Sequence, residues 1–315
     1  MPRRKVTVVG SGFVGSTSAQ RIFESGLADV CLIDIIEGKP QGIALDLMQA
    51  APVLNVEGRI IGTNNPKDTY GSDVVLMTAG MPRKPGMDRS DLLDVNGKII
   101  NAVADYVRQG SPHAVVVVVT NPLDTMVFQM HKRTSFSVER VMGMAGVLDS
   151  ARLRCFIGME LGAGVSDIDA MVLGGHGDAM VPLPRYSTVN GISIEKLIPD
   201  AQISAIADRT RNGGAEIVNL LKTGSAYYAP SAAAVAMVKS ILNDEKRVLP
   251  TSAFLTGQYG LEGLYMGVPC VLGAKGVEKI IQLDLEPKER ELLHKSAESI
   301  RKDLEILKKK GLLAD

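Results

Sequence analysis

His176 is the histidine whose neighbours leave it most open, because it stands in the segment Gly174-Gly175-His176-Gly177-Asp178 directly after a predicted buried strand. Flanking glycines leave an imidazole accessible to a ligand. An imidazole also titrates near neutral pH, so His176 suits general acid/base chemistry. The alternative is a core histidine satisfied within the fold, and the segment alone leaves both open. The other histidines lie before a strand or in charged helical segments, where a solvated side chain is expected; they are His113, His131 and His294.

Asp149 and Arg152 are three residues apart on a helix predicted to begin at Leu148, so they share one helix face. One interpretation is a local ion pair. In the other, Asp149 points at His176, fixes the tautomer of the ring and favours its charged form. Arg152 is then free to bind a carboxylate through its two-pronged donor face. The spacing alone does not choose between the two.

A glycine-rich turn follows the first apolar run of the chain, Val6–Val9. Gly10 permits a tight turn, Gly12 lets backbone N–H groups approach a pyrophosphate, and Gly15 lets the next helix pack against the strand. The phosphates would lie at the N-terminus of that helix, where unpaired N–H groups favour negative charge. The pattern predicts a dinucleotide-binding turn made of Gly10, Ser11, Gly12, Phe13, Val14 and Gly15.

Asp34 follows the next predicted strand, Val30–Ile33, about twenty residues after the turn. A carboxylate there accepts hydrogen bonds from both hydroxyls of an adenine ribose and repels a 2′-phosphate. No lysine or arginine follows until Lys39. The sequence therefore favours NAD over NADP, whereas an ordinary strand-to-helix turn would leave Asp34 unexplained.

The composition is that of a soluble globular protein of one large or two smaller domains. The 315 residues include 35 basic and 35 acidic ones and no tryptophan, so nothing points to nucleic acid or to a membrane surface. Three separated cysteines, Cys31, Cys155 and Cys270, are typical of reduced core thiols, and no ligand cluster suggests a metal. The first apolar run is too short for a signal or a membrane span, so we expect a cytoplasmic protein.

Two further predicted strands end in polar residues, Thr78-Ala79-Gly80 and Thr120-Asn121-Pro122. Parallel strands carry their ligand crevice at their carboxyl ends, so both tripeptides should line one cleft. We predict an α/β fold: a doubly wound parallel sheet of the Rossmann type over residues 1–145, then an α+β substrate-binding and catalytic domain over 146–315. Strands are expected at 6–9, 30–33, 60–61, 73–77, 115–119, 138–144 and 168–173, and helices at 41–49, 90–109, 148–161, 203–221, 231–242 and 287–310.

From Lys5 to its C-terminal helix the chain resembles the lactate/malate dehydrogenase family. The motifs that carry the likeness are the glycine turn, the segments 78–87, 120–124 and 148–152, and Gly174–Asp178. The resemblance implies that His176 is the proton donor and acceptor and Asp149 its orienting carboxylate. It also implies that Arg152 holds the C1 carboxylate of the substrate, and that Arg89, on a mobile loop, polarises the reacting carbonyl. Asn121 would contact substrate and nicotinamide, and Asn96, Val119 and Thr120 would contact the cofactor.

Within the family, two positions favour malate dehydrogenases over lactate dehydrogenases. Arg83 stands where lactate dehydrogenases usually have glutamine, and a buried second carboxylate needs a cation. The other interpretation of Arg83 is a solvated loop cation beside Lys84. Ala226 stands where lactate dehydrogenases usually have threonine, which has a bulkier side chain.

The resemblance therefore implies NAD-dependent oxidation of (S)-malate to oxaloacetate in the tricarboxylic acid cycle. A lactate or other 2-hydroxyacid dehydrogenase is the alternative, and a catalytically silent NAD-binding protein is another. A homodimer or homotetramer is also implied. The apolar helix with Ala44, Leu45, Leu47 and Met48 is either core or subunit contact, and we favour contact.

Overall fold

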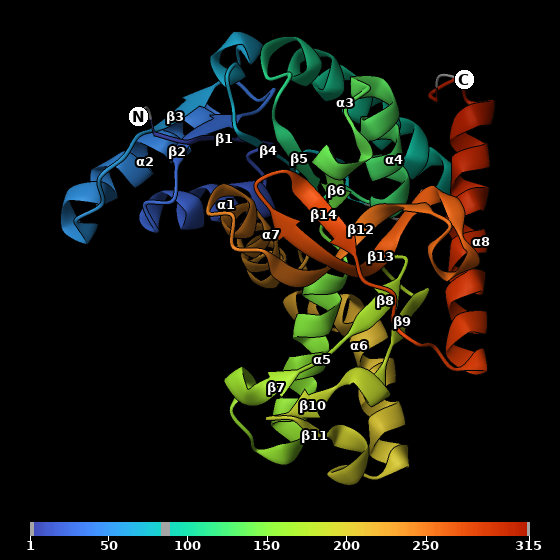
Figure 1. The fold of residues 1–315 in the computed structure, drawn as a ribbon. Coiled ribbons are helices and arrows are strands. Elements are labelled where there is room, and N and C mark those ends of the chain that lie inside the picture. The colour runs from blue at the N-terminus through green and yellow to red at the C-terminus, as the bar shows by residue number, and fades with distance from the viewer. Residues whose placement is uncertain (1–2, 83–88, 314–315) are drawn as a thin grey trace.

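The computed structural model describes residues 3–82 and 89–313. The first half alternates strands and helices (Figure 1). Its elements are β1 (Lys5–Val9), α1 (Phe13–Glu24), β2 (Asp29–Ile33), α2 (Lys39–Leu54), β3 (Ile60–Thr63), β4 (Val74–Met77), α3 (Arg89–Gly110), β5 (Val115–Val118), α4 (Leu123–Thr134), the 3-10 turn η2 (Val138–Arg140) and β6 (Val141–Gly143).

The second half mixes helices with antiparallel strands. Its elements are α5 (Gly146–Leu161), β7 (Ile168–Asp169), β8 (Val172–Gly174), β9 (Met180–Pro182), β10 (Thr188–Val189), β11 (Ile192–Ser193), α6 (Asp200–Leu221), α7 (Tyr228–Leu242), β12 (Arg247–Thr256), β13 (Glu262–Gly273), β14 (Gly276–Ile280) and α8 (Pro287–Lys309). Among the described residues, no helix combines the length and apolarity that crossing a bilayer requires.

Six parallel strands in the order β3-β2-β1-β4-β5-β6 form the nucleotide-binding half of the sheet. Successive side chains of a strand point to opposite faces. Val115 and Val117 of β5 accordingly join the core cluster that includes α1 and α7, whereas Val116 and Val118 join the cluster with α3 and α4. Both faces are covered by helices, which confirms the predicted doubly wound sheet and explains its runs of apolar residues.

The same sheet continues past β6 into the antiparallel strands β12, β13, β8 and β9, and β14 pairs with β13. The sequence patterns did not predict β12, β13 or β14. Pro250 and Pro269 face each other in the middle of β12 and β13, and proline weakens a strand signal because it has no N–H to donate. Because the sheet crosses between the halves, the predicted division at residue 145 stays a prediction.

A smaller lobe lies below the main sheet, where α5 and α6 pack beside the short sheet β11-β10-β7 (Figure 1). Three sequence predictions were wrong in this lobe or elsewhere in the chain. The single strand expected at 168–173 is split between β7 and β8, which belong to different sheets. The strand expected at 138–144 begins only at Val141, after η2. Pro122, expected inside the first turn of α4, instead precedes that helix as its N-cap residue.

His131 and His294 are half-buried, so the expectation of solvated side chains was wrong for both. The His131 ring lies 5.8 Å from the ring centroids of Phe254 and Tyr265, and burial lowers its pKa. Nε2 of His294 lies 3.0 Å from the backbone oxygen of Tyr259. All three contacts come from the hairpin β12–β13 and its turn, which the sequence did not predict. His113 is exposed, as expected.

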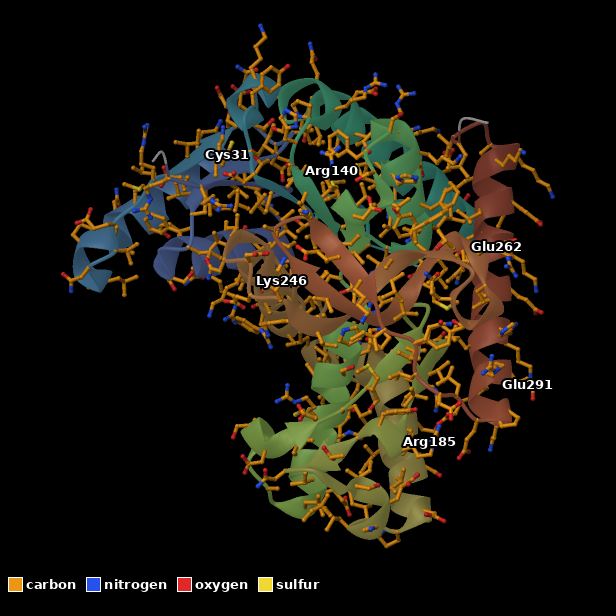
Figure 2. The ribbon with its side chains drawn as sticks, viewed as in Figure 1. Cys31, Arg140, Arg185, Lys246, Glu262 and Glu291 are labelled. Carbon is orange, nitrogen blue, oxygen red and sulfur yellow. The ribbon has the colours of Figure 1, made fainter. Side chains whose placement is uncertain are left out.

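The cysteines are free, with Cys31 and Cys270 buried and Cys155 only partly so. Cys31 lies on β2 within the nucleotide-binding half (Figure 2). Two of the labelled basic residues pair with acids on other segments: Arg185 reaches Glu289 of α8 at 3.0 Å, and Lys246 pairs with Glu278 of β14 (Figure 2). Such mixed pairing on the surface agrees with the balanced charge of the chain.

Candidate active site

The glycine turn joins β1 to α1, and two of its three glycines stand where a side chain would have no room. Gly10 has φ +100°, and a Cβ there would lie 2.8 Å from the backbone of Ala79. A Cβ on Gly15 would lie 1.8 Å from the carbonyl oxygen of Gly10, so only glycine lets α1 pack this closely. A Cβ on Gly12 would meet no atom within 4 Å. The turn is therefore closed against the protein at Gly10 and Gly15 and open at Gly12, as a backbone cradle for phosphates requires.

Asp34 closes the other side of the turn at the end of β2. Its Oδ2 accepts the N–H of Ser11 at 2.5 Å and the Ser11 hydroxyl at 2.7 Å, and its Oδ1 accepts the N–H of Ile36 at 3.0 Å. Burial would raise the pKa of Asp34, but the hydrogen bonds from Ser11 and Ile36 outweigh it and hold that pKa below its ordinary value. The sequence placed both residues beside the cofactor but did not predict their mutual bonds.

A cleft of about 540 Å³ runs from this turn to His176. Most of the predicted site residues line it: Gly12, Phe13, Val14, Gly15, Asn96, Val119, Thr120, Asn121, Arg152 and His176. Gly10, Ser11, Asp34 and Asp149 are not among the residues that line it. Arg83 falls outside the described residues. Gly80, Arg211 and Ala226 line the cleft as well. The carboxyl ends of the parallel strands and the catalytic segment thus face one cavity.

His176 and Asp149 meet through a hydrogen bond of 2.9 Å between Nδ1 and Oδ2. Asp149 lies in the first turn of α5, and its neighbour Ser150 accepts the N–H of Val172 at 3.0 Å, which fixes this turn against β8. Burial would lower the pKa of His176, but the Asp149 carboxylate outweighs it and raises that pKa above 6.5. Because Nδ1 is engaged, Nε2 is the ring nitrogen left for a ligand.

Arg152 lies beside this pair and is itself largely buried, with its side chain 14% exposed. Its Nη1 lies 3.3 Å from Oδ1 of Asp149, and its Nε has no hydrogen-bond partner among the described residues. The α6 helix leaves room for it, since a Cβ on Gly213 would approach its Cδ to 3.1 Å. Burial lowers the pKa of Arg152, although Asp149 opposes this. The Asp149 carboxylate therefore contacts both Arg152 and the His176 ring, while the binding of a substrate carboxylate by Arg152 stays a prediction.

Arg89 is directed elsewhere. It opens α3 and donates through Nε and Nη2 to the two carboxylate oxygens of Asp303 on α8, at 2.6 and 2.5 Å. This bidentate bond raises the pKa of Arg89. The Arg89 side chain is 58% exposed and is absent from the cleft lining, so its expected contact with the substrate carbonyl stays a prediction.

Asn96 serves the backbone at the strand ends. It is buried, its Oδ1 accepts the N–H of Met81 at 2.7 Å, and its Nδ2 donates to the carbonyl of Asn121 at 2.7 Å. Thr120 adds a parallel link, donating its hydroxyl to the carbonyl of Ala79 at 2.7 Å. These bonds hold the segments after β4 and β5 together, while the expected cofactor contacts of both residues stay predictions.

A second carboxylate, Asp124, lies beside the catalytic segment. The sequence patterns did not point to it as a functional residue, although it ends the segment 120–124 that carries part of the family likeness. Asp124 opens α4 and accepts the backbone N–H of His176 at 3.0 Å. Two serines also support the His176 segment. Ser252 of β12 donates its hydroxyl to Asp124, and Ser296 of α8 accepts the N–H of Gly175. An acid just after a buried strand was the available signal for Asp124, whereas the serines carry no sequence signal of this kind.

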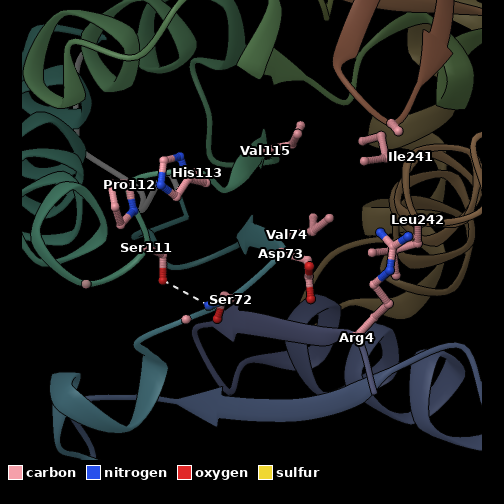
Figure 3. A pocket seen from close by; sticks show the side chains of 13 residues that line it. Arg4, Ser72, Asp73, Val74, Ser111, Pro112, His113, Val115, Ile241 and Leu242 are labelled. Carbon is pink, nitrogen blue, oxygen red and sulfur yellow. Dashed lines mark hydrogen bonds between the residues drawn. The ribbon is translucent and has the colours of Figure 1, made fainter. Parts of the chain in front are cut away.

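A second cavity, of about 280 Å³, lies at the opposite edge of the sheet, where β4 and β5 begin (Figure 3). Arg4, Asp73 and His113 line it, and Ser111 accepts the backbone N–H of Ser72 at 3.1 Å beside them (Figure 3). Its lining includes none of the predicted site residues. Within the described part of the chain, no group of three or more histidine, cysteine or acidic side chains could hold a metal ion.

Comparison with known proteins places this fold and site in a family. Residues 4–143 match the model of the lactate/malate dehydrogenase NAD binding domain, and residues 146–310 match that of the lactate/malate dehydrogenase alpha/beta C-terminal domain. The chain belongs to the lactate/malate dehydrogenase family. Because its first half matches an NAD binding domain and its relatives include malate dehydrogenases, the protein is an NAD-dependent oxidoreductase.

The relatives include a malate dehydrogenase of Roseiflexus sp. (strain RS-1), 53% identical over 97% of this chain and 99% of its own, and one of Bacillus subtilis (strain 168), 51% identical over 97% and 98%. Malate and lactate dehydrogenases of Cryptosporidium parvum both superpose with a TM-score of 0.95 over 98% of this chain and 99% of theirs, at 46% and 44% identity. The fold therefore does not distinguish the two substrates.

Proposed function

We propose that this protein is a malate dehydrogenase that interconverts (S)-malate and oxaloacetate with NAD, as a step of the tricarboxylic acid cycle. The observation that carries the reaction class is the His176–Asp149 pair beside the buried Arg152 at the end of the nucleotide cleft. The relatives that are about half identical over nearly the whole chain are malate dehydrogenases, which supports the choice of substrate.

The residues around the glycine turn fit NAD. The open space at Gly12 and the N-terminus of α1 suit the pyrophosphate, and the anionic Asp34 suits a ribose with free hydroxyls. The same cleft is lined by Asn96, Val119, Thr120 and Asn121 as well as by His176. When bound, NAD accepts the hydride from malate and NADH returns it to oxaloacetate.

The catalytic corner supplies the proton and the charges. Arg152, whose Nε has no hydrogen-bond partner among the described residues, binds the C1 carboxylate of the substrate. In the direction of reduction, protonated His176 donates from Nε2 to the oxygen on C2, where negative charge develops. In oxidation the neutral ring takes that proton back. Asp149 stabilises the imidazolium and holds its tautomer through Nδ1.

The second carboxylate of malate or oxaloacetate distinguishes these substrates from lactate and pyruvate. Arg83 is the proposed cation for it, on the basis of the family resemblance. Ala226, whose small side chain lines the cleft, leaves space for the longer substrate. Arg89 would act on the reacting carbonyl, which requires its guanidinium to leave Asp303.

Initial rates with oxaloacetate and with pyruvate, followed at the NADH absorbance, test the proposal. We expect kcat/KM for oxaloacetate to exceed that for pyruvate by about 100-fold or more, because the methyl group of pyruvate cannot pair with the cation that the second carboxylate would bind. In Arg83→Gln this preference should fall by about tenfold or more. Lys84→Gln is the matched control, being the adjacent loop cation. Preference for pyruvate in the native enzyme would identify a lactate dehydrogenase, and absence of turnover with either substrate would favour a silent NAD-binding protein.

We further propose a homodimer or homotetramer in the cytoplasm. Leu45 and Met48 of α2 are 60% and 37% exposed, which supports a subunit contact on this helix, whereas Ala44 is buried in the core. Three free cysteines agree with a reducing compartment. Light scattering of the purified protein tests the assembly, because a particle of 33.6 kDa would be a monomer and would contradict it.

A further inference from the structure

Two carboxylates, and not one, hold the His176 segment. Asp149 binds the ring, and Asp124 binds the backbone: its Oδ2 accepts the N–H of His176 at 3.0 Å, and its Oδ1 accepts the hydroxyl of Ser252 at 2.7 Å. Asp124 is only 5% exposed. Both of these partners are neutral groups. Burial raises the pKa of Asp124 although their hydrogen bonds oppose it, so keeping this carboxylate charged in the interior costs stability. Such a cost close to a cleft is typical of functional sites.

We propose that Asp124 is a positioning residue for the proton transfer: it fixes the backbone of His176 and places a second negative charge beside the imidazolium. The inference rests on the proposed role of His176 as proton donor and acceptor. Asp124 does not line the cleft, so it acts only through His176.

The need for positioning follows from the glycines around His176. Gly174 has φ +86° and Gly177 has φ +117°, and Gly175 lies between Gly174 and His176, so the segment has little conformational preference of its own. Bonds from neighbouring elements must hold it. They come from Asp149 on α5, from Asp124 on α4, and from Ser296 of α8, whose Oγ accepts the N–H of Gly175 at 2.8 Å. Only the first two of these bonds bring a charge.

The charge balance around His176 gives Asp124 a measurable effect. Asp149 and Asp124 both favour the imidazolium, and Arg152 opposes it. Asp178 of the same segment and Arg211 of α6 also line the cleft. Asp303 of α8, which pairs with Arg89, accepts the hydroxyl of Thr125, the neighbour of Asp124, at 3.4 Å. Removing the Asp124 charge should therefore lower the pKa of His176, while removing the neutral bond from Ser296 should not.

Asp124→Asn separates charge from shape. Its amide oxygen can still accept the His176 N–H, and its NH₂ can donate to the Ser252 oxygen, because a hydroxyl also accepts. Ser296→Ala is the matched control, since it removes one bond to the same segment without changing a charge. Ser252→Ala is a second test. It leaves Oδ1 of Asp124 without its donor, so the carboxyl group takes up a proton more readily.

Histidine-labelled protein without cofactor gives a readout independent of turnover. The chain has four histidines, and His176→Asn assigns the resonance of His176. In Asp124→Asn the titration midpoint of His176 should fall by about one pH unit, and the high-pH limb of oxaloacetate reduction should move down with it. Ser252→Ala should shift the midpoint in the same direction by less, and Ser296→Ala should leave it in place even where it slows turnover.

An unmoved midpoint in folded Asp124→Asn, or an equal shift in Ser296→Ala, would overturn the charge role of Asp124. Should Asp124→Asn not fold, Ser252→Ala decides, because an unchanged midpoint there also contradicts the proposal. A native enzyme that reduces no oxaloacetate would instead contradict the proposed function, and the titrations would still report on Asp124.

Discussion

The nucleotide turn and the catalytic corner of the same cleft are held in different ways. The turn is shaped by close backbone packing: a Cβ on Gly15 would collide with Gly10 of the same segment, and a Cβ on Gly10 with Ala79 after β4. The corner is assembled from four elements, with His176 after β8, Asp149 and Arg152 on α5, Asp124 on α4 and Ser296 on α8. The turn is therefore a steric device, whereas the corner depends on hydrogen bonds and charges between distant segments.

This difference means that the two regions should fail separately. Changes in the catalytic corner should affect proton transfer and substrate binding but leave cofactor binding unchanged, because the residues proposed to bind the cofactor and the substrate belong to different elements. Changes at Asp34 should alter the choice of cofactor and spare the chemistry. Arg89 lies outside both, since its guanidinium pairs with Asp303 on α8.

The largest effect is expected at His176. His176→Asn removes the proton donor while leaving the turn intact, so kcat should fall by about 10³-fold with little change in the Kd of NADH. Stopped-flow kinetics and fluorescence titration of NADH check the two halves of this prediction. His113→Asn, an exposed histidine at the other edge of the sheet, is the control. Turnover near the native value would remove His176 from the chemistry.

Arg152 should give the next largest effect. Arg152→Gln loses the charge that binds the C1 carboxylate, so kcat/KM for oxaloacetate should fall by about 100-fold, chiefly through KM. Arg154→Gln on the same helix is the matched control, because its guanidinium donates to the carbonyl of Val165 instead. Steady-state rates over a range of oxaloacetate concentrations measure the split, and an unchanged KM would mean that another group holds this carboxylate.

Asp34 tests the opposite region. Asp34→Ser removes the anion that repels a 2′-phosphate, so the ratio of kcat/KM for NADH to that for NADPH should fall by about tenfold or more while kcat with NADH is kept. Asp29→Ser, at the start of the same strand and paired with Arg3, serves for comparison. Equal ratios in the two variants would show that Asp34 does not face the ribose.

The smallest effect is expected from the pair between Arg89 and Asp303. The Arg89 side chain is 58% exposed, so solvent screens its pair with the buried Asp303, and we expect the pair to contribute on the order of 1 kcal/mol. If Arg89 has to leave Asp303 to reach the substrate, Asp303→Asn should raise kcat/KM for oxaloacetate by about threefold. Thr125→Val, which removes a 3.4 Å contact with Asp303 but no charge, is the control. A tenfold loss of kcat/KM in Asp303→Asn would contradict this account.

Local patterns predicted the turn well and the corner only in part. The spacing of Gly10, Gly12 and Gly15 states a backbone requirement that a single segment satisfies, so it can be read without the fold. The contact of Asp149 with His176 remained one of two interpretations, because it depends on how α5 packs against β8. Asp124 escaped notice as a functional residue because its partner lies 52 positions away.

The errors in the predicted fold have a similar physical cause. The parallel strands were found because both of their faces are buried and their sequences are continuously apolar. The hairpin of β12 and β13 was missed because facing prolines interrupt its pattern. That omission also misplaced His131 and His294, whose burial comes from contacts with this hairpin.

The pH dependence of the two reaction directions tests most directly whether one buried imidazole carries the proton both ways. The raised pKa of His176 means that the ring stays protonated to a pH above 6.5. Measured from about pH 6 to about pH 9, kcat/KM for oxaloacetate should therefore fall as the pH rises through the pKa, and kcat/KM for malate should fall as the pH drops through it. Flat profiles, or profiles that change in the same direction, would contradict the account.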